Sequence, residues 1–300
     1  MTDPALPVLP TLGVGSYAAP GWYIAMRRQA RRGELGAHDE QELVEDATRI
    51  VIGDQIEAGV DVLTDGELSR QRFVYEVFDR LAGLSRRPPL RRLGIAGYDM
   101  APSFQAEGAI RAPEGLGIIE EFERLTRLAP THAKKIALPG PFTFMQSIDA
   151  GSRAPDAVLD ELCDVIRSEL DGLVAAGAGY IQVDEPGLTR LPAERLRGEA
   201  APRLNRLLGG LSARRCLHVC FGNNAGRPMA DRRLQPLQAL LAAIDCEELM
   251  LEFANRGMIE LELAGELAKH ATIAAGVIDV KNFWPEPASE VARRIEACLV

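Results

Sequence analysis

A histidine and a cysteine lie two residues apart, where a short apolar run leads into Gly222 and Asn223. This pattern is typical of a buried strand that ends in a loop. Side chains two apart project from the same face of a strand, so the imidazole of His218 and the thiol of Cys220 should point together. An imidazole beside a thiolate is a ligand pair that suits zinc. Taken alone, the pair is more often two ordinary core side chains, since unpaired cysteines often pack as small hydrophobes.

Polar side chains stand at the ends of the other strand-like runs as well. These ends carry Ser16, Asp65, Glu67, Asp184, Glu185, Glu252 and Asp279. Each has a plain explanation, because Asp and Glu are common in loops and as helix N-caps. Together they predict a pocket rich in carboxylates that lacks a basic cradle for phosphate. A buried Glu252 needs a partner, and a metal next to His218 and Cys220 would supply one.

Strand-like and helix-like segments alternate along the chain and must position these side chains. Strands are expected at 11–16, 60–67, 136–143, 180–186, 216–221, 248–255 and 272–280, and helices at 39–58, 70–83, 117–128, 156–176, 200–211, 235–243, 258–268 and 289–300. This order predicts a parallel sheet with helices outside it. We therefore expect residues 1–300 to form a single α/β domain, a TIM (β/α)₈ barrel, with working residues at the carboxyl ends of the strands.

Two features depart from a regular barrel. Residues 84–113 carry Arg, Pro and Gly without a long period, which predicts an excursion such as a β-hairpin or a lid, with a strand at 94–98. The pattern also contains seven strands, and a barrel has eight. Either the N-terminal run or the excursion adds a strand, or the last β-α unit is missing after Val300. The interpretation that the last β-α unit is missing is favoured.

Composition narrows the class of partner. The formal net charge of −9 argues against nucleic acid and against an anionic membrane surface. Five cysteines in 300 residues show no disulfide framework, and the first ten residues lack the pattern of a signal peptide. No apolar run approaches the roughly 20 residues that a membrane span needs. A cytoplasmic protein is expected.

Taken together, the motifs resemble the zinc-dependent, cobalamin-independent methionine synthases, specifically their C-terminal catalytic barrel. The resemblance runs over most of the chain and is carried by Val14-Gly15-Ser16, Asp65-Gly66-Glu67, Gly140-Pro141-Phe142-Thr143, Gln182-Val183-Asp184-Glu185-Pro186, His218-Val219-Cys220, Glu252 and Gly276-Val277-Ile278-Asp279-Val280-Lys281. Several ordered motifs at intervals compatible with a barrel are far more specific than any one of them.

The resemblance implies a zinc ion on His218, Cys220 and Glu252, joined by a substrate thiol. Zinc would stabilise the thiolate, whose free pKa is roughly 8.5, and present it as the nucleophile at neutral pH. The implied reaction is methyl transfer to homocysteine, which forms methionine.

The resemblance also implies how the amino acid is held. Glu67 and Asp184 would bind the ammonium group of homocysteine and count as the catalytic pair, and the backbone around Gly15 and Ser16 would meet its carboxylate. Two carboxylates suit a cation, and backbone N–H groups suit an anion.

The fourth zinc ligand and the methyl donor stay open. The family's remaining zinc cysteine follows the seventh helix, where this chain ends, and Cys216, Cys246 and Cys298 are poor substitutes. The tryptophan that stacks on folate in full-length synthases falls on Ser147, and their N-terminal barrel is absent. The donor could therefore be methylcobalamin, a corrinoid protein or methyl-tetrahydrofolate.

Two other functions compete with this one. A thiol/epoxide alkyltransferase of the coenzyme M type would keep the zinc thiolate, but it needs a sulfonate site, whereas Glu67 and Asp184 favour an amino-acid thiol. A catalytically silent barrel that binds a thiol or a corrinoid is the alternative from another class, and the missing cysteine is its best support.

Overall fold

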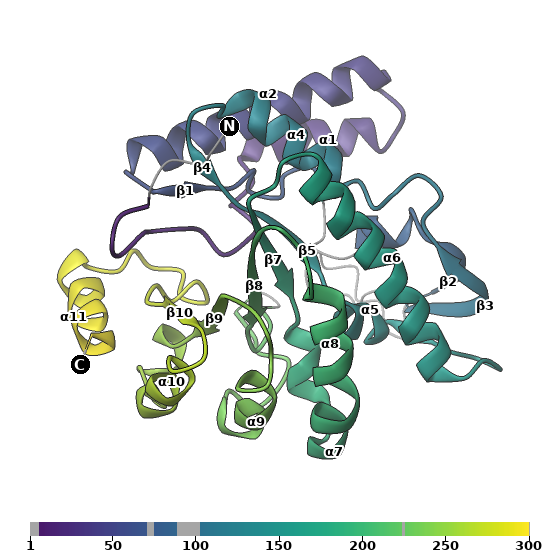
Figure 1. Cartoon of the computed structure of the whole chain (residues 1–300). Helices are drawn as coiled ribbons and strands as arrows, with labels where there is room; N and C mark the ends of the chain where they lie inside the picture. The colour runs from purple at the N-terminus through teal and green to yellow at the C-terminus, as the bar shows by residue number, and fades with distance from the viewer. Residues whose placement is uncertain (1–5, 71–74, 89–102, 224–225, 300) are drawn as a thin grey trace. The chain divides into compact units, whose positions relative to one another are not determined.

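The computed structural model describes residues 6–70, 75–88, 103–223 and 226–299. They divide into two compact units. The first comprises Met1–Leu81, Ala112–Ala137 and Ser168–Ile181, and the second Ala82–Arg111, Leu138–Arg167 and Gln182–Val300. Three elements run from one unit into the other: β5 (Ile136–Pro139), α6 (Pro155–Ala175) and β7 (Tyr180–Asp184) (Figure 1).

The first unit is built on helices and one short parallel strand pair. Its remaining elements are α1 (Gly21–Ala30), α2 (Ala37–Glu57), β1 (Val62–Leu63), α3 (Tyr75–Phe78), α4 (Ile118–Leu128) and β4 (Ala133–Lys134). β1 and β4 pair in parallel, and the strand expected at 11–16 is reduced to one bridge from Leu12 to Val62. Gly13 and Gly15 alternate there, and a strand with no side chains to pack is weak.

A buried carboxylate fixes the start of α4. Glu169 accepts the backbone N–H groups of Leu116, Ile118 and Ile119 at 2.8, 2.8 and 3.2 Å, so it satisfies donors that a helix N-terminus leaves open. Buried apolar residues then recur at helical spacing, with Phe122 one turn after Ile118. Glu121 lies on this same buried side of α4, which brings its charge inside the unit.

A five-stranded sheet organises the second unit. Its order is β10-β9-β8-β7-β5, with β8 at Arg214–Val219, β9 at Glu248–Glu252 and β10 at Thr272–Gly276. β8 and β10 pair in parallel with β9, so that His218 lies opposite Met250 and Gly276 opposite Glu252. Every residue of β7 is buried, as expected for a strand covered on both faces. The predicted α/β class with parallel pairing is confirmed.

The excursion is an antiparallel ribbon. β2 (Ala82–Arg87) pairs with β3 (Ser103–Arg111), which also runs parallel to β6 (Ile148–Asp149). The expected strand at 94–98 lies outside the described residues. The helix predicted to reach residue 83 was wrong at its end, because β2 already begins at Ala82.

Helical segments make up the rest of the second unit. They are α5 (Pro141–Met145), η1 (Pro186–Arg190), α7 (Ala193–Arg195), η2 (Leu196–Ala200), α8 (Ala201–Leu208), η3 (Gln235–Leu237), α9 (Gln238–Leu241), η4 (Ala254–Arg256), α10 (Leu261–Leu267) and α11 (Ala288–Cys298). The helix expected from residue 258 begins only at Leu261, because Met258 and Glu260 have left-handed backbone angles.

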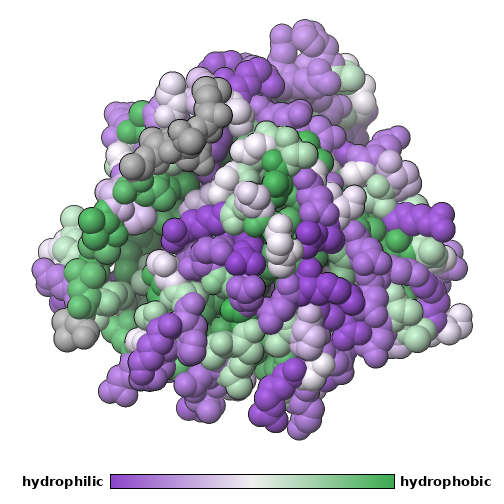
Figure 2. Space-filling view, in the orientation of Figure 1, coloured by the Kyte–Doolittle hydropathy of each residue, from purple (hydrophilic) through white to green (hydrophobic). Residues whose placement is uncertain are grey.

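The last helix lies largely on the surface. α11 buries none of its residues, and Figure 2 shows hydrophobic surface over it. Ile295 is 38% exposed and Leu299 just beyond is 61% exposed. Within the described ranges, no helix has both the length and the apolar composition needed to cross a membrane.

Candidate active site

The loop after β1 holds Glu67 in a strained conformation. Its φ angle is +55°, a left-handed value that is uncommon for a residue other than glycine. Asp65 Oδ1 accepts the backbone N–H of Glu67 at 3.0 Å, and the carbonyl of Gly66 accepts the N–H of Tyr17 at 2.9 Å. Strain of this kind costs about 1–3 kcal/mol and concentrates at functional sites, where neighbouring contacts enforce it.

The sequence-predicted residues Gly15, Ser16 and Glu67 come together in this unit. The Ser16 hydroxyl donates to Glu67 Oε2 at 2.5 Å. A Cβ on Gly15 would lie 3.1 Å from Glu67 Oε1, a tight contact, so glycine here leaves room for the close approach of the carboxylate. The predicted juxtaposition of these three residues is therefore present in the structure.

Sequence reasoning missed the ion pair behind Glu67. Arg70 Nη1 lies 3.5 Å from Glu67 Oε1, and its Nε and Nη2 donate to Glu121 Oε2 at 2.9 and 2.6 Å. The Arg70 side chain is 3% exposed and that of Glu121 is 7% exposed. Arg70 follows Glu67 by three residues, and that spacing was the available signal.

The buried charges perturb one another. Burial and the charge of Glu121 raise the pKa of Asp65 to about 6, although Arg70 opposes this shift. Burial alone would lower the pKa of Arg70, but the carboxylates of Glu121 and Glu67 outweigh it and raise that pKa. Arg70 is thus a fixed cation at the centre of this cluster.

In the second unit, β7 and β8 bring Asp184 and His218 into contact. His218 Nδ1 lies 2.6 Å from Asp184 Oδ1, which also accepts the side-chain amide of Gln182 at 2.6 Å. The Asp184 side chain is 2% exposed and that of His218 is 11% exposed. Burial alone would lower the pKa of His218, but Cys220 and Asp184 outweigh it and raise that pKa to about 10.

Cys220 and Glu252 lie at the ends of the neighbouring strands β8 and β9. Cys220 is close enough to His218 to raise the pKa of the imidazole, as expected for a pair that shares one face. Glu252 Oε2 accepts the N–H of Phe221 at 3.5 Å, and its Oε1 accepts from Lys281 Nζ at 2.6 Å. The Lys281 side chain is 3% exposed. The partner of the half-buried Glu252 in this structure is therefore an ammonium group.

The side chains of His218, Cys220 and Glu252 are of the types that bind zinc. A carboxylate on Nδ1 fixes the ring of a metal-binding histidine and leaves Nε2 for the metal, and Asp184 stands in that relation to His218. Cys220 supplies the sulfur and Glu252 the carboxylate. No three His, Cys, Asp or Glu side chains converge as a ligand set among the described residues. Because Lys281 occupies Glu252, the carboxylate must exchange that partner to join His218 and Cys220.

Glu185 is a structural carboxylate. It is fully buried and accepts the N–H groups of Phe142 and Thr143 at 3.0 and 2.8 Å and the Thr143 hydroxyl at 2.7 Å. A Cβ on Gly140 would lie 2.2 Å from its Oε1, so that position must be glycine. Burial raises the pKa of Glu185 to about 8 despite these donors. It ties the end of β7 to the first turn of α5.

The chain is an α/β protein in which each unit, taken by itself, carries ionisable side chains at the ends of parallel strands. A family profile described as "Cobalamin-independent synthase, Catalytic domain" matches residues 9–299. The methionine synthase of Saccharolobus solfataricus is 30% identical over 98% of this chain and 84% of its own length. That of Sulfurisphaera tokodaii is 31% identical over 98% and 82%.

A solved structure agrees with these relatives. The B12-independent methionine synthase from Shewanella sp. W3-18-1, in complex with selenomethionine, superposes with a TM-score of 0.81. It is 26% identical, and the match covers 98% of this chain and 87% of that one. The chain belongs to the cobalamin-independent synthase family, as a catalytic domain, and is a methyltransferase. The resemblance inferred from its motifs is thereby confirmed.

Proposed function

We propose that this chain transfers a methyl group to the thiol of homocysteine, forming methionine, and that it depends on zinc. The observation that carries the proposal is the Asp184–His218–Cys220 arrangement, in a chain whose relatives are methionine synthases over nearly its whole length. The homologue from Shewanella sp. was solved with selenomethionine, an analogue of that product. A (β/α)₈ barrel forming one functional domain is the architecture that we propose for these strands.

His218, Cys220 and Glu252 would hold the zinc ion. A bound zinc ion lowers the pKa of a substrate thiol, which is ordinarily about 8.5, so that the thiolate is available at neutral pH. The hydrogen bond that Asp184 accepts from His218 Nδ1 keeps the imidazole ring oriented. In the transfer, the sulfur forms a bond to the methyl carbon, and the bond from that carbon to the donor breaks with its electron pair on the donor.

Glu67, Ser16 and Gly15 would receive the amino-acid end of homocysteine, as the resemblance implies. Glu67 offers a buried carboxylate that a hydroxyl and a guanidinium already orient. Asp184 keeps its implied part in ammonium binding as a prediction, next to its observed contact with His218. Glu67→Gln should raise KM for homocysteine at least about tenfold and leave KM for 4-mercaptobutanoate, which lacks the amine, nearly unchanged. Equal losses for both thiols would remove this role.

A corrinoid is the methyl donor that we propose. A folate ring needs an aromatic or apolar platform, which is worth on the order of 1 kcal/mol beyond burial. Phe142 and Phe144 lie in α5, which begins directly after Gly140, but they are only 2% and 1% exposed, and Ser147 offers no ring. Neither phenylalanine presents a face to a ligand.

Parallel assays with homocysteine and each donor test the whole proposal. Turnover should be faster with methylcobalamin than with methyl-tetrahydrofolate, in full-length protein loaded with zinc. Faster turnover with the folate would reverse the donor assignment. Turnover with coenzyme M in place of homocysteine would favour the epoxide-type alkyltransferase. If no thiol is methylated by either donor, a barrel that only binds a thiol or a corrinoid becomes the better explanation, and the ion pair of Glu252 with Lys281 would then be its resting arrangement.

A further inference from the structure

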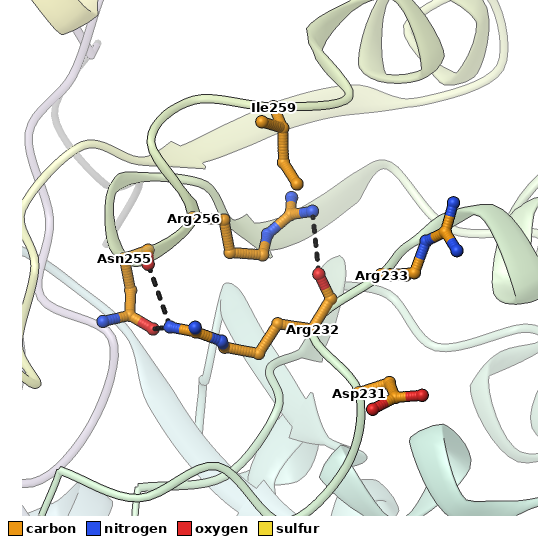
Figure 3. Close-up of a pocket in the computed structure, with 6 residues that line it drawn as sticks. All are labelled: Asp231, Arg232, Arg233, Asn255, Arg256 and Ile259. Carbon is orange, nitrogen blue, oxygen red and sulfur yellow. Dashed lines mark hydrogen bonds between the residues drawn. The ribbon is translucent and has the colours of Figure 1, made fainter.

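A pocket of about 550 Å³ lies in the second unit, between the segment that follows β8 and the segment that follows β9 (Figure 3). It is lined by Asp231, Arg232, Arg233, Asn255, Arg256 and Ile259. This volume is within the range of about 300–1,000 Å³ that is usual for small-molecule sites. Neither the predicted zinc ligands nor the predicted homocysteine residues line it.

Arg256 is built into the wall of this pocket. Its side chain is 1% exposed, and the guanidinium carbon lies 5.2 Å from the ring centroids of both Phe221 and Phe253. Nε donates to the backbone oxygen of Glu252 at 2.9 Å. The two rings and this hydrogen bond fix the direction of the guanidinium, because a planar fork stacked on aromatic faces has little freedom.

One end of the Arg256 guanidinium lacks a partner. Nη1 donates to the Glu260 carboxylate and, at 3.5 Å, to the backbone oxygen of Arg232. Nη2 is buried and makes no hydrogen bond within the part of the chain that the structure describes. A buried donor left unpaired costs about 1–3 kcal/mol, and more for a charged group. In Figure 3 the side chain of Ile259, which is 51% exposed, points toward this end.

Two further arginines stand at the rim. Arg232 Nη1 donates to the backbone oxygen of Asn255 at 3.1 Å and to its Oδ1 at 2.5 Å. These two hydrogen bonds hold the Arg232 side chain extended toward Asn255 (Figure 3). Arg233 is exposed beside it, and Asp231 is the acidic residue among those that line the pocket. This lining is positive although the chain as a whole carries a net charge of −9. A local excess of this sign attracts anions.

We propose that this pocket binds an oxyanion, a carboxylate or a phosphate, carried by a small molecule. Arg256 Nη2 would donate from the buried wall, and Arg232 would add the exposed donor, with Arg233 contributing charge. Guanidinium groups match both oxyanions because each can accept two parallel N–H bonds. Ile259 would move from the buried end of Arg256 and cover the apolar part of the ligand. The site is independent of the methyl-transfer proposal and could be present whether or not that proposal holds.

Calorimetry on the full-length protein at low salt tests the site, with inorganic phosphate and glutarate as separate probes. We expect binding in the millimolar range or tighter, weakened at least about tenfold by Arg232→Gln and abolished by the double change with Arg233→Gln. Arg197→Gln, which removes an exposed arginine from η2, should leave binding unchanged. Arg256→Lys keeps the charge but loses the fork, so it should weaken binding as well. Thermal denaturation of that variant separates lost binding from lost folding.

Each result decides the matter. Binding of phosphate alone would assign a phosphorylated ligand, and binding of glutarate alone a polycarboxylate. Absence of binding by both probes would overturn the proposal. So would binding that Arg232→Gln leaves unchanged, or that Arg197→Gln weakens as much as Arg232→Gln does, because the attraction would then be general to surface charge. Loss of methyl transfer with intact anion binding, or the reverse, would separate this site from the proposed function.

Discussion

Buried charges gather at strand ends in two regions of this chain, and the two clusters differ in how their charges are paired. After β1, the guanidinium of Arg70 serves Glu67 and Glu121 at once, and all three side chains are almost fully buried. After β8 and β9, Glu252 is held by one lysine, and Cys220 is only partly buried.

The difference separates a fixed arrangement from an exchangeable one. A bidentate arginine enclosed by carboxylates cannot leave without exposing several charges, so the first cluster keeps the Glu67 loop in one conformation. A single lysine on a flexible stem can leave Glu252 for solvent or for another position. The first cluster therefore suits recognition of a fixed group, and the second suits exchange of one cation for another.

The largest effect is expected from removing a predicted zinc ligand in the second region. Cys220→Ser should remove about one zinc per chain and lower kcat/KM for methyl transfer by roughly a thousandfold, which corresponds to about 4 kcal/mol. His218→Ala should behave in the same way. Cys298→Ser, a change of another partly buried cysteine in α11, is the matched control and should retain both metal and activity. Elemental analysis and initial rates give the two readouts. Unchanged zinc in both site variants would show that the metal lies elsewhere or is not bound.

The next largest effect is expected from removing the cation of the first region. Arg70→Met leaves Glu67 and Glu121 buried without their cation, so the free energy of unfolding should fall by about 3–5 kcal/mol. Arg49→Met removes an exposed pair with Glu45 in the same unit and should cost less than about 0.5 kcal/mol. Denaturant unfolding measures both. Similar small losses for the two variants would mean that the Arg70 cluster relaxes into water and is not a fixed arrangement.

The sequence predicted positions along strands better than partners across the fold. Period-two alternation placed His218 and Cys220 on one face, and the order of strands placed Glu252 beside them. Both inferences need only local pattern and parallel pairing. Arg70 pairs with Glu121, which lies 51 residues further along the chain, because the packing of α4 directs that glutamate into the interior. No local pattern encodes such a pairing.

The same limit explains the other misses. Lys281 belonged to a recognised motif, but its contact with Glu252 depends on the path of the loop after β10, where Asp279 Oδ1 accepts the Lys281 N–H at 3.0 Å. The strand expected at 11–16 failed because glycine alternation mimics a strand without supplying side chains to pack. The left-handed start of α10 at Glu260 was likewise invisible to apolar periodicity.

A smaller effect, on zinc affinity, is expected from removing the lysine that pairs with Glu252, and it tests whether the charges of the second region exchange. Lys281→Met removes the cation that competes with zinc for Glu252, so zinc affinity should rise by about tenfold, or about 1.4 kcal/mol. The metal-free variant should also melt at a lower temperature, because Glu252 loses its partner, and zinc should restore more stability than in the parent. Competition with a chromophoric chelator and thermal denaturation measure these effects. Lys269→Met removes an exposed pair with Glu266 and controls for loss of a lysine. Unchanged zinc affinity in Lys281→Met would assign Lys281 a purely structural part.

The smallest effect concerns the pH dependence of the first region. Asp65 binds its proton more tightly in the folded chain, where its pKa is about 6, than in an unfolded chain, where an Asp pKa is about 3.9. Folding therefore takes up a proton between these values, and the stability from this group is fully present below about pH 4 and lost as the pH rises through about 6. Asp65→Asn keeps an oxygen that accepts the Glu67 N–H, but its side chain cannot titrate. The free energy of unfolding should therefore fall by on the order of 1–2 kcal/mol less in this variant than in the parent as the pH rises. Asp61→Asn is the control, because hydrogen bonds from Thr11 lower the pKa of that exposed carboxylate, so its contribution is lost only below about pH 4 and the variant should keep the parent's slope at higher pH. Urea unfolding from about pH 4 to about pH 7 gives the slopes. An Asp65→Asn variant with the parent's slope would show that Asp65 is charged in the folded chain throughout this range, and that Arg70 compensates three carboxylates instead of two.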